Sequence, residues 1–193
     1  MKNAMLRPFE IIQEKQLFLI GLFLLLLASI FAFLTHTRFD GVLDMHLTNH
    51  IQWYQPFLDN GINTLCLTLF FYLLSLLQPT KARIIDLLNV ALICRIPLYF
   101  TLLTNIGGIN KETTEYIVNH LDNPLAIKEL PLINLLVLGG GALLALGALV
   151  IMGFLIYNGY KNATNAKKAS HLVLLLVAVL AAEGVSKLLV YCY

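Results

Sequence analysis

The sequence predicts an all-α, polytopic membrane protein: a bundle of five transmembrane helices, with the N-terminus inside the cell and the C-terminus outside. Three observations carry this prediction. Of the 193 residues, 59% are hydrophobic and 12% are charged, whereas an average soluble domain has about 25% charged residues. The apolar residues gather in five runs, each long enough to cross a hydrocarbon core of about 30 Å. Basic residues cluster in alternate connections between these runs.

Composition also excludes several classes of function. The formal net charge is only +2, and the basic residues are scattered, so the chain lacks the positive stripe that nucleic-acid binding needs. There is no Gly-x-Ser-x-Gly elbow, no phosphate-binding Walker loop and no pair of acids within one apolar run. The sequence therefore predicts a protein that is not an enzyme, binds no nucleic acid and needs no cofactor.

The first two predicted spans are residues 17–34 and 57–77. The first carries no charge over its whole length. A signal peptide is the alternative for this run, but the preceding charges are mixed in sign and no A-x-A cleavage site follows. The second ends at Gln78-Pro79-Thr80-Lys81, where proline and charge together stop a helix.

The third predicted span, residues 84–106, is the irregular one. It carries the polar residues Asn89 and Arg95, and it closes at Gly107-Gly108. Pro97 lacks a backbone N–H group and clashes with the preceding turn, so we expect a kink near the middle of this span.

The fourth and fifth predicted spans are residues 131–157 and 170–191. Both carry small residues on one side, and such residues let helices approach closely in lipid. We expect these stripes to dock the two spans on each other or on a third helix, and a homodimer seam is the alternative. The stripes are Gly141, Ala145 and Ala148 in the fourth span, and Ala178, Ala182 and Ser186 in the fifth.

A short amphipathic helix is predicted outside the membrane at residues 110–121, with Asn110 as its N-cap. It would pack on the outer mouth of the bundle, or present a surface to a partner.

The distribution of lysine and arginine sets the predicted orientation, because basic residues near span ends stay on the cytoplasmic side. The predicted inner segments hold Lys2, Arg7, Lys15, Lys81, Arg83, Lys161, Lys167 and Lys168. The predicted outer segments hold Arg38, Lys111 and Lys128.

A buried polar network is expected near the middle of the membrane. Arg95 and Glu183 each lie roughly 17 Å from the inner ends of their spans, at 1.5 Å per residue. Charges at that depth cost at least about 2.5 kcal/mol and should face protein, so we predict an Arg95–Glu183 ion pair, with Asn89 nearby. An intrahelical pair between Glu183 and Lys187 is the competing arrangement. Such a network either fixes which helices are neighbours or forms a site on a transport pathway.

Two histidines of the first outer segment, His46 and His50, would share a face if that segment were helical. This spacing makes them weak candidates for a zinc site. No glutamate completes a His-Glu-x-x-His motif, and no metal is predicted.

The order of these features resembles the Yip family, the small five-span membrane proteins related to Ypt/Rab-interacting proteins, in its bacterial form. The resemblance rests on Arg7-Pro8-Phe9, on Lys81-Ala82-Arg83 leading to Arg95-Ile96-Pro97, and on Asn158-Gly159-Tyr160-Lys161-Asn162-Ala163-Thr164. It implies five spans and no catalytic residue. Eukaryotic members are implied to bind prenylated GTPases through a long cytosolic region with an Asp-Leu-Tyr-Gly-Pro element. Because that element is missing here, GTPase binding is in doubt for this chain.

The function predicted from the sequence is that of a non-enzymatic scaffold or partner subunit, a multi-pass protein of the bacterial inner membrane. Its expected partners are the lipid bilayer and other membrane proteins, or a second copy of the chain. The alternative is a small transporter or channel-like subunit that uses Arg95, Glu183 and Lys187 as a polar site at the middle of the membrane.

Overall fold

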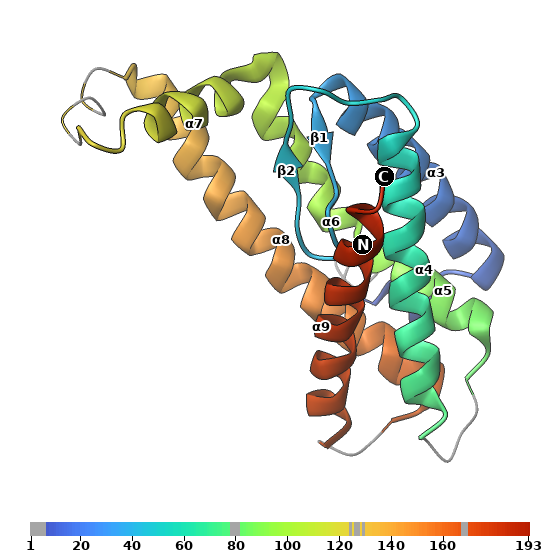
Figure 1. The fold of residues 1–193 in the computed structure, drawn as a ribbon. Helices are drawn as coiled ribbons and strands as arrows, with labels where there is room; N and C mark the ends of the chain where they lie inside the picture. The colour runs from blue at the N-terminus through green and yellow to red at the C-terminus, as the bar shows by residue number, and fades with distance from the viewer. Residues whose placement is uncertain (1–6, 78–81, 124, 126–127, 129, 167–169) are drawn as a thin grey trace.

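The structure, a computed structural model, describes residues 7–77, 82–123, 125, 128, 130–166 and 170–193. These residues fold into a bundle of helices (Figure 1), and five helical segments are long and apolar enough to cross a membrane. The predicted all-α class is confirmed, and so is the presence of five helical segments of the length and composition that a membrane span needs.

In the described part of the chain, three helices precede the third crossing. They are the short α2 (Pro8–Ile11), α3 (Glu14–Leu34) and α4 (Gln55–Ser75). The two long helices begin two or three residues before the predicted spans, because polar residues at the membrane interface continue the helix beyond the apolar run.

The third crossing is broken, as Pro97 led us to expect. It consists of α5 (Ile84–Cys94), α6 (Ile96–Tyr99) and the 3-10 segment η1 (Phe100–Gly108). The α-helix is interrupted at Arg95, two residues before the proline. The main-chain direction changes at Gly107 and Gly108, which adopt left-handed φ angles of 74° and 80° that glycine reaches without steric cost.

The last three helices are α7 (Ile109–Asn119), α8 (Leu132–Thr164) and α9 (Ser170–Val190). The predicted short amphipathic helix is present as α7, but its N-cap is Gly108 rather than Asn110. Asn105 takes over the capping role, since its Oδ1 accepts a hydrogen bond from the Lys111 N–H at 3.0 Å. The helix α8 continues to Thr164, well past the predicted end of its span at residue 157.

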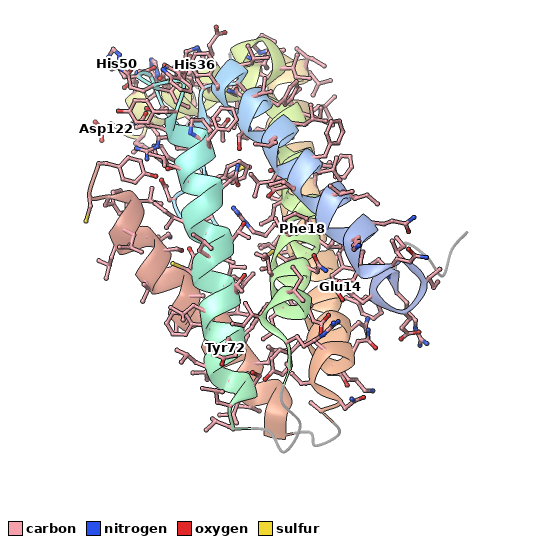
Figure 2. The ribbon with its side chains drawn as sticks, turned by 90° about the vertical axis from the view of Figure 1, so that its right-hand side faces the viewer. Glu14, Phe18, His36, His50, Tyr72 and Asp122 are labelled. Atoms are coloured by element: carbon pink, nitrogen blue, oxygen red, sulfur yellow. The ribbon has the colours of Figure 1, made fainter. Side chains whose placement is uncertain are left out.

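Successive crossings run in opposite directions (Figure 1). His36, His50 and Asp122 lie at one end of the bundle, and Tyr72 lies towards the other (Figure 2). We call the end that holds His36, His50 and Asp122 the hairpin end, because a hairpin described below enters the bundle there. The other end is called the opposite end.

The first connection does not stay outside the bundle. Its strands β1 (Thr37–Arg38) and β2 (His46–Leu47) pair antiparallel, enter the bundle from the hairpin end and turn back beside α9 (Figure 1). We call residues 37–47 the re-entrant hairpin. Phe39 and Val42 within it are fully buried, a burial that was not predicted for this connection.

The stripes of small residues do not dock the fourth and fifth spans on each other. Instead α9 packs along α4, while α8 packs against α5, α6, η1 and α7. Ala182 and Ser186 of α9 are fully buried, in a helix whose main neighbour is α4. On α8, a Cβ added to Gly141 would lie 3.3 Å from the Thr104 side chain. The absence of a side chain at Gly141 therefore lets α8 pack closely against η1.

Candidate functional site: a buried polar centre around the re-entrant hairpin

One side of α4 is polar along its first half. Asp59, Asn60 and Asn63 are all fully buried, and their spacing of one and four residues places them on one side of a helix. Asn63 Nδ2 donates to the carbonyl of Phe39 at 2.9 Å, and Asn60 Nδ2 donates to Ser29 Oγ at 2.9 Å. Asn63 therefore supplies a donor to the hairpin backbone, and Asn60 links α4 to α3, as buried polar groups require where no water is present.

Asp59 binds both the hairpin and the C-terminal residue. Its carboxylate accepts from Arg38 Nε at 3.1 Å and from Arg38 Nη2 at 2.8 Å, and Tyr193 OH donates to Oδ1 at 2.5 Å. The hydrogen bond to Asp59 raises the pKa of Arg38. Burial, followed by the same carboxylate, raises the pKa of Tyr193. Arg38 thus stays protonated, and the end of the chain is tied to α4.

A second carboxylate, Asp40, holds the hairpin strands together. Its Oδ2 lies 2.6 Å from His46 Nδ1. This hydrogen bond is the largest cause that raises the pKa of His46 above its ordinary value. The protonated form of His46 is therefore favoured. The weak zinc candidates His46 and His50 do not share a helical face, because His46 lies in the strand β2 and its Nδ1 is engaged by Asp40. Among the residues that the structure describes, no three metal-ligating side chains come together.

The tip of the hairpin contacts α9 through charged groups. Glu183 Oε2 accepts from the backbone N–H of Leu43 at 2.8 Å. Lys187 Nζ lies 2.7 Å from Asp44 Oδ2 and 3.3 Å from Glu183 Oε1. The intrahelical pair between Glu183 and Lys187 is thus confirmed. Gly41 makes this approach possible, since a Cβ there would lie 2.5 Å from Glu183 Oε1.

Arg95 lies on the other side of the hairpin and is fully buried. Its Nη1 donates to the carbonyl of Asn60 at 3.3 Å. Its guanidinium carbon lies 5.5 Å from the ring centroid of Phe39 and 5.8 Å from that of Tyr99. Aromatic faces attract a desolvated cation by about 2 kcal/mol, so these two rings take the place of an anion.

The predicted Arg95–Glu183 ion pair is wrong: no ion pair of Arg95 occurs within the described part of the chain. The hairpin explains why Arg95 and Glu183 do not pair. The ring of Phe39 contacts Arg95, and the backbone N–H of Leu43 donates to the carboxylate of Glu183. Asn89 does not join this network either. Its Nδ2 donates to the carbonyl of Glu14 at 3.2 Å, towards the opposite end of the bundle.

The polar centre brings charged groups of both signs together but is not fully hydrogen-bonded. Its basic side chains are Arg38, His46, Arg95 and Lys187, and its carboxylates are Asp40, Asp44, Asp59 and Glu183. Arg95 Nε and Nη2 have no hydrogen-bond partner, and neither do Asn60 Oδ1 and Asn63 Oδ1. A buried polar group without a hydrogen bond costs about 1–3 kcal/mol. These groups indicate that the centre is arranged mainly for its charged contacts.

Comparison with known proteins does not assign the chain. No family model, curated protein or solved structure matches it. An account of its function therefore rests on the arrangement of its own side chains.

Sequence reasoning found Arg95, Glu183 and Lys187 but missed the groups that organise them. Asp59, Asn60 and Asn63 were visible in the second span, at the spacing of one helical side. Such a polar side within an apolar run indicates that irregular backbone, rather than lipid, covers that part of the helix.

Proposed function

We propose that this chain is a non-enzymatic, Yip-like scaffold or partner subunit of the bacterial inner membrane. One observation carries the proposal: the charge at the middle of the third crossing is closed off from solvent. Arg95 is fully buried, and its guanidinium group is packed between the rings of Phe39 and Tyr99. Most of the charged groups are engaged by the hairpin, which leaves them little capacity to bind a substrate.

The contacts at the opposite end support an orientation with the N-terminus inside and the C-terminus outside. Arg83 binds Glu14 there, and Asn162 Nδ2 donates to the carbonyl of Phe9. The N-terminal segment, the beginning of α5 and the end of α8, which carry predicted inner charges, therefore meet at one end of the bundle. Arg38, a predicted outer residue, lies near the other end. Lys2, Lys81, Lys167 and Lys168, which share in this prediction, lie outside the described residues.

Two of the segments that resemble the Yip family also meet. A Cβ on Gly159 would lie 2.8 Å from the ring of Phe9 and 2.8 Å from Val90. The Arg7-Pro8-Phe9 segment thus packs on the Asn158–Asn162 segment of α8. This contact gives the two motifs a shared structural role, which supports the resemblance.

The surface of α8 is suited to a membrane partner. Much of its length is exposed and apolar, with Leu143 and Val150 each 73% exposed. A Cβ added at Gly139, Gly140 or Gly153 would meet no atom within 4 Å. A helix with small residues on an open face allows close approach of another transmembrane helix.

A transporter is the second candidate, and the unpaired Nε and Nη2 of Arg95 favour it. In such a protein the hairpin would have to move to open a path to the guanidinium group.

Affinity purification from native membranes in mild detergent, combined with flux measurements in liposomes, separates the two functions. We expect a membrane protein or a second copy to be recovered in stoichiometric amount, and no flux that depends on Glu183. The chain recovered alone, with flux that Glu183→Gln abolishes and the exposed Glu112→Gln leaves intact, would contradict the scaffold proposal.

A further inference from the structure

The imidazole of His46 lies at the boundary between the re-entrant hairpin and an open cavity. Its side chain is 44% exposed, and it lines a cavity of about 280 Å³ between the hairpin, η1, α7 and α8. The other walls include Thr101 of η1, Asn110 of α7 and Leu138 of α8. Among the described residues that line this cavity, His46 is the only one that titrates near neutral pH. Because its ring is partly exposed, His46 can exchange protons with water.

The carboxylate of Asp40 lies on the buried side of the same contact. Its side chain is only 7% exposed, and its Oδ2 lies 2.6 Å from His46 Nδ1. The Oδ1 atom has no hydrogen-bond partner within the described part of the chain. A buried carboxylate is stable only when it is paired. The protonation state of His46 therefore decides whether Asp40 faces a cation or a neutral ring.

The other charges near His46 oppose each other. Arg38 is the register partner of His46 in the strand pair, and its charge disfavours a second cation there, whereas Asp59 of α4 favours one. These two groups form an ion pair of their own at 2.8 Å. Tyr193, which donates to Asp59, has a raised pKa and stays uncharged near neutral pH. Asp40 is therefore the group that determines the charge of His46.

The residues around Asp40 close the centre of the bundle. Phe39 directly precedes Asp40, and its ring centroid lies 5.5 Å from the guanidinium carbon of Arg95. Val42, two residues after Asp40, is fully buried. The His46–Asp40 contact thus fixes the strand segment that covers Arg95.

We propose that the His46–Asp40 pair is a pH switch in the re-entrant hairpin. The protonated pair holds the segment 39–42 inside the bundle. Loss of the proton from His46 leaves the Asp40 carboxylate buried against a neutral ring, so this segment moves outward and uncovers Arg95. The switch goes beyond the proposed function, because it operates in a scaffold and in a transporter alike.

The direction of the pH dependence follows from the partner of His46. Its hydrogen bond to Asp40 raises the pKa of His46 above the ordinary value of 6.5. The contact is therefore complete below pH 6.5, and its contribution is lost as the pH rises through the raised pKa of His46. The hairpin should open at alkaline pH and close at acidic pH.

Labelling of a buried cysteine measures the opening. In a Cys192→Ser background, Val42→Cys places a thiol of similar size at a fully buried position of the hairpin, while Cys66 and Cys94 are buried. The rate of its reaction with a neutral maleimide is measured at about pH 5.5 and about pH 8.5, on either side of the titration range of histidine. Each rate is divided by that of His50→Cys, an exposed position, which removes the effect of pH on the reagent and on the thiol.

We expect this ratio to rise about fivefold from the lower to the higher pH, which corresponds to about 1 kcal/mol for a partly exposed ion pair. Adding His46→Gln should remove the rise, since an amide does not titrate. His120→Gln is the matched control, because His120 is an exposed histidine of the same end that stacks on Tyr116. It should leave the rise intact. A constant ratio in the parent protein, or an equal rise after His46→Gln, would overturn the proposal.

A second measurement keeps Val42 in place. Histidine signals in nuclear magnetic resonance spectra give the pKa of His46 directly, and His46→Gln assigns its signal. Asp40→Asn keeps the shape of the side chain and removes its charge, so the pKa of His46 should fall in this variant. The same pKa in the wild type and in Asp40→Asn would contradict the role of the pair.

Discussion

Replacing Asp59 by alanine should lower the free energy of unfolding by about 3–5 kcal/mol, the usual cost of removing one partner of a buried ion pair. The Asp59 side chain is fully buried, and that of Arg38 is 13% exposed. The substitution leaves this guanidinium without its two hydrogen bonds, and it releases the hydroxyl of Tyr193. Unfolding of the purified protein by titration with sodium dodecyl sulfate measures the loss.

Two further variants show whether the loss belongs to the ion pair. The double variant Arg38→Met with Asp59→Ala should lose less than Asp59→Ala alone, because no buried charge is left unpaired. Asp122→Ala removes an exposed carboxylate at the same end (Figure 2) and should change stability by less than about 0.5 kcal/mol. Equal losses in the single and double variants would show that Arg38 and Asp59 are not coupled.

Replacing Gly41 by alanine should cost about 2–3 kcal/mol through overpacking at the hairpin tip. The added methyl group would lie 2.5 Å from Glu183 Oε1, and this carboxylate is already held by the Leu43 N–H and by Lys187. Either the hairpin moves away from α9, or Glu183 gives up these partners.

A double-mutant cycle isolates this contact. In a Glu183→Ala background the obstructing carboxylate is absent, so the same Gly41→Ala change should cost less than about 1 kcal/mol. Thermal unfolding in detergent of the four proteins in the cycle gives the coupling energy. If Gly41→Ala lowers stability equally in both backgrounds, the hairpin tip does not contact Glu183.

The crossings could be predicted from sequence because each depends on a local property, the length of an apolar run. The break in the third crossing followed equally well from the local effect of Pro97. The end of α8 was missed for a related reason: Lys161 and its polar neighbours end the apolar run, but they do not end the helix.

The polar centre could be predicted only in part. The depth of Arg95 and Glu183 follows from counting residues along helices, and it was right to expect both within the bundle. Their separation depends on the re-entrant hairpin, which has only two residues in each strand and no apolar run of its own. Its place is set by contacts distant in sequence, such as Asn63 with Phe39 and Glu183 with Leu43. No local pattern encodes such contacts.

Chemical cross-linking tests most directly whether the hairpin lies inside the bundle against α9. In a Cys192→Ser background, Asp44→Cys and Lys187→Cys place thiols where the two native side chains lie 2.7 Å apart, while Cys66 and Cys94 are buried. A short bifunctional maleimide should link positions 44 and 187 within one chain, and mass spectrometry should detect one chain plus one linker. The pair His50→Cys and Lys187→Cys should not link, because His50 lies at the hairpin end (Figure 2). Efficient linkage at 50 and 187, with none at 44 and 187, would contradict the re-entrant hairpin.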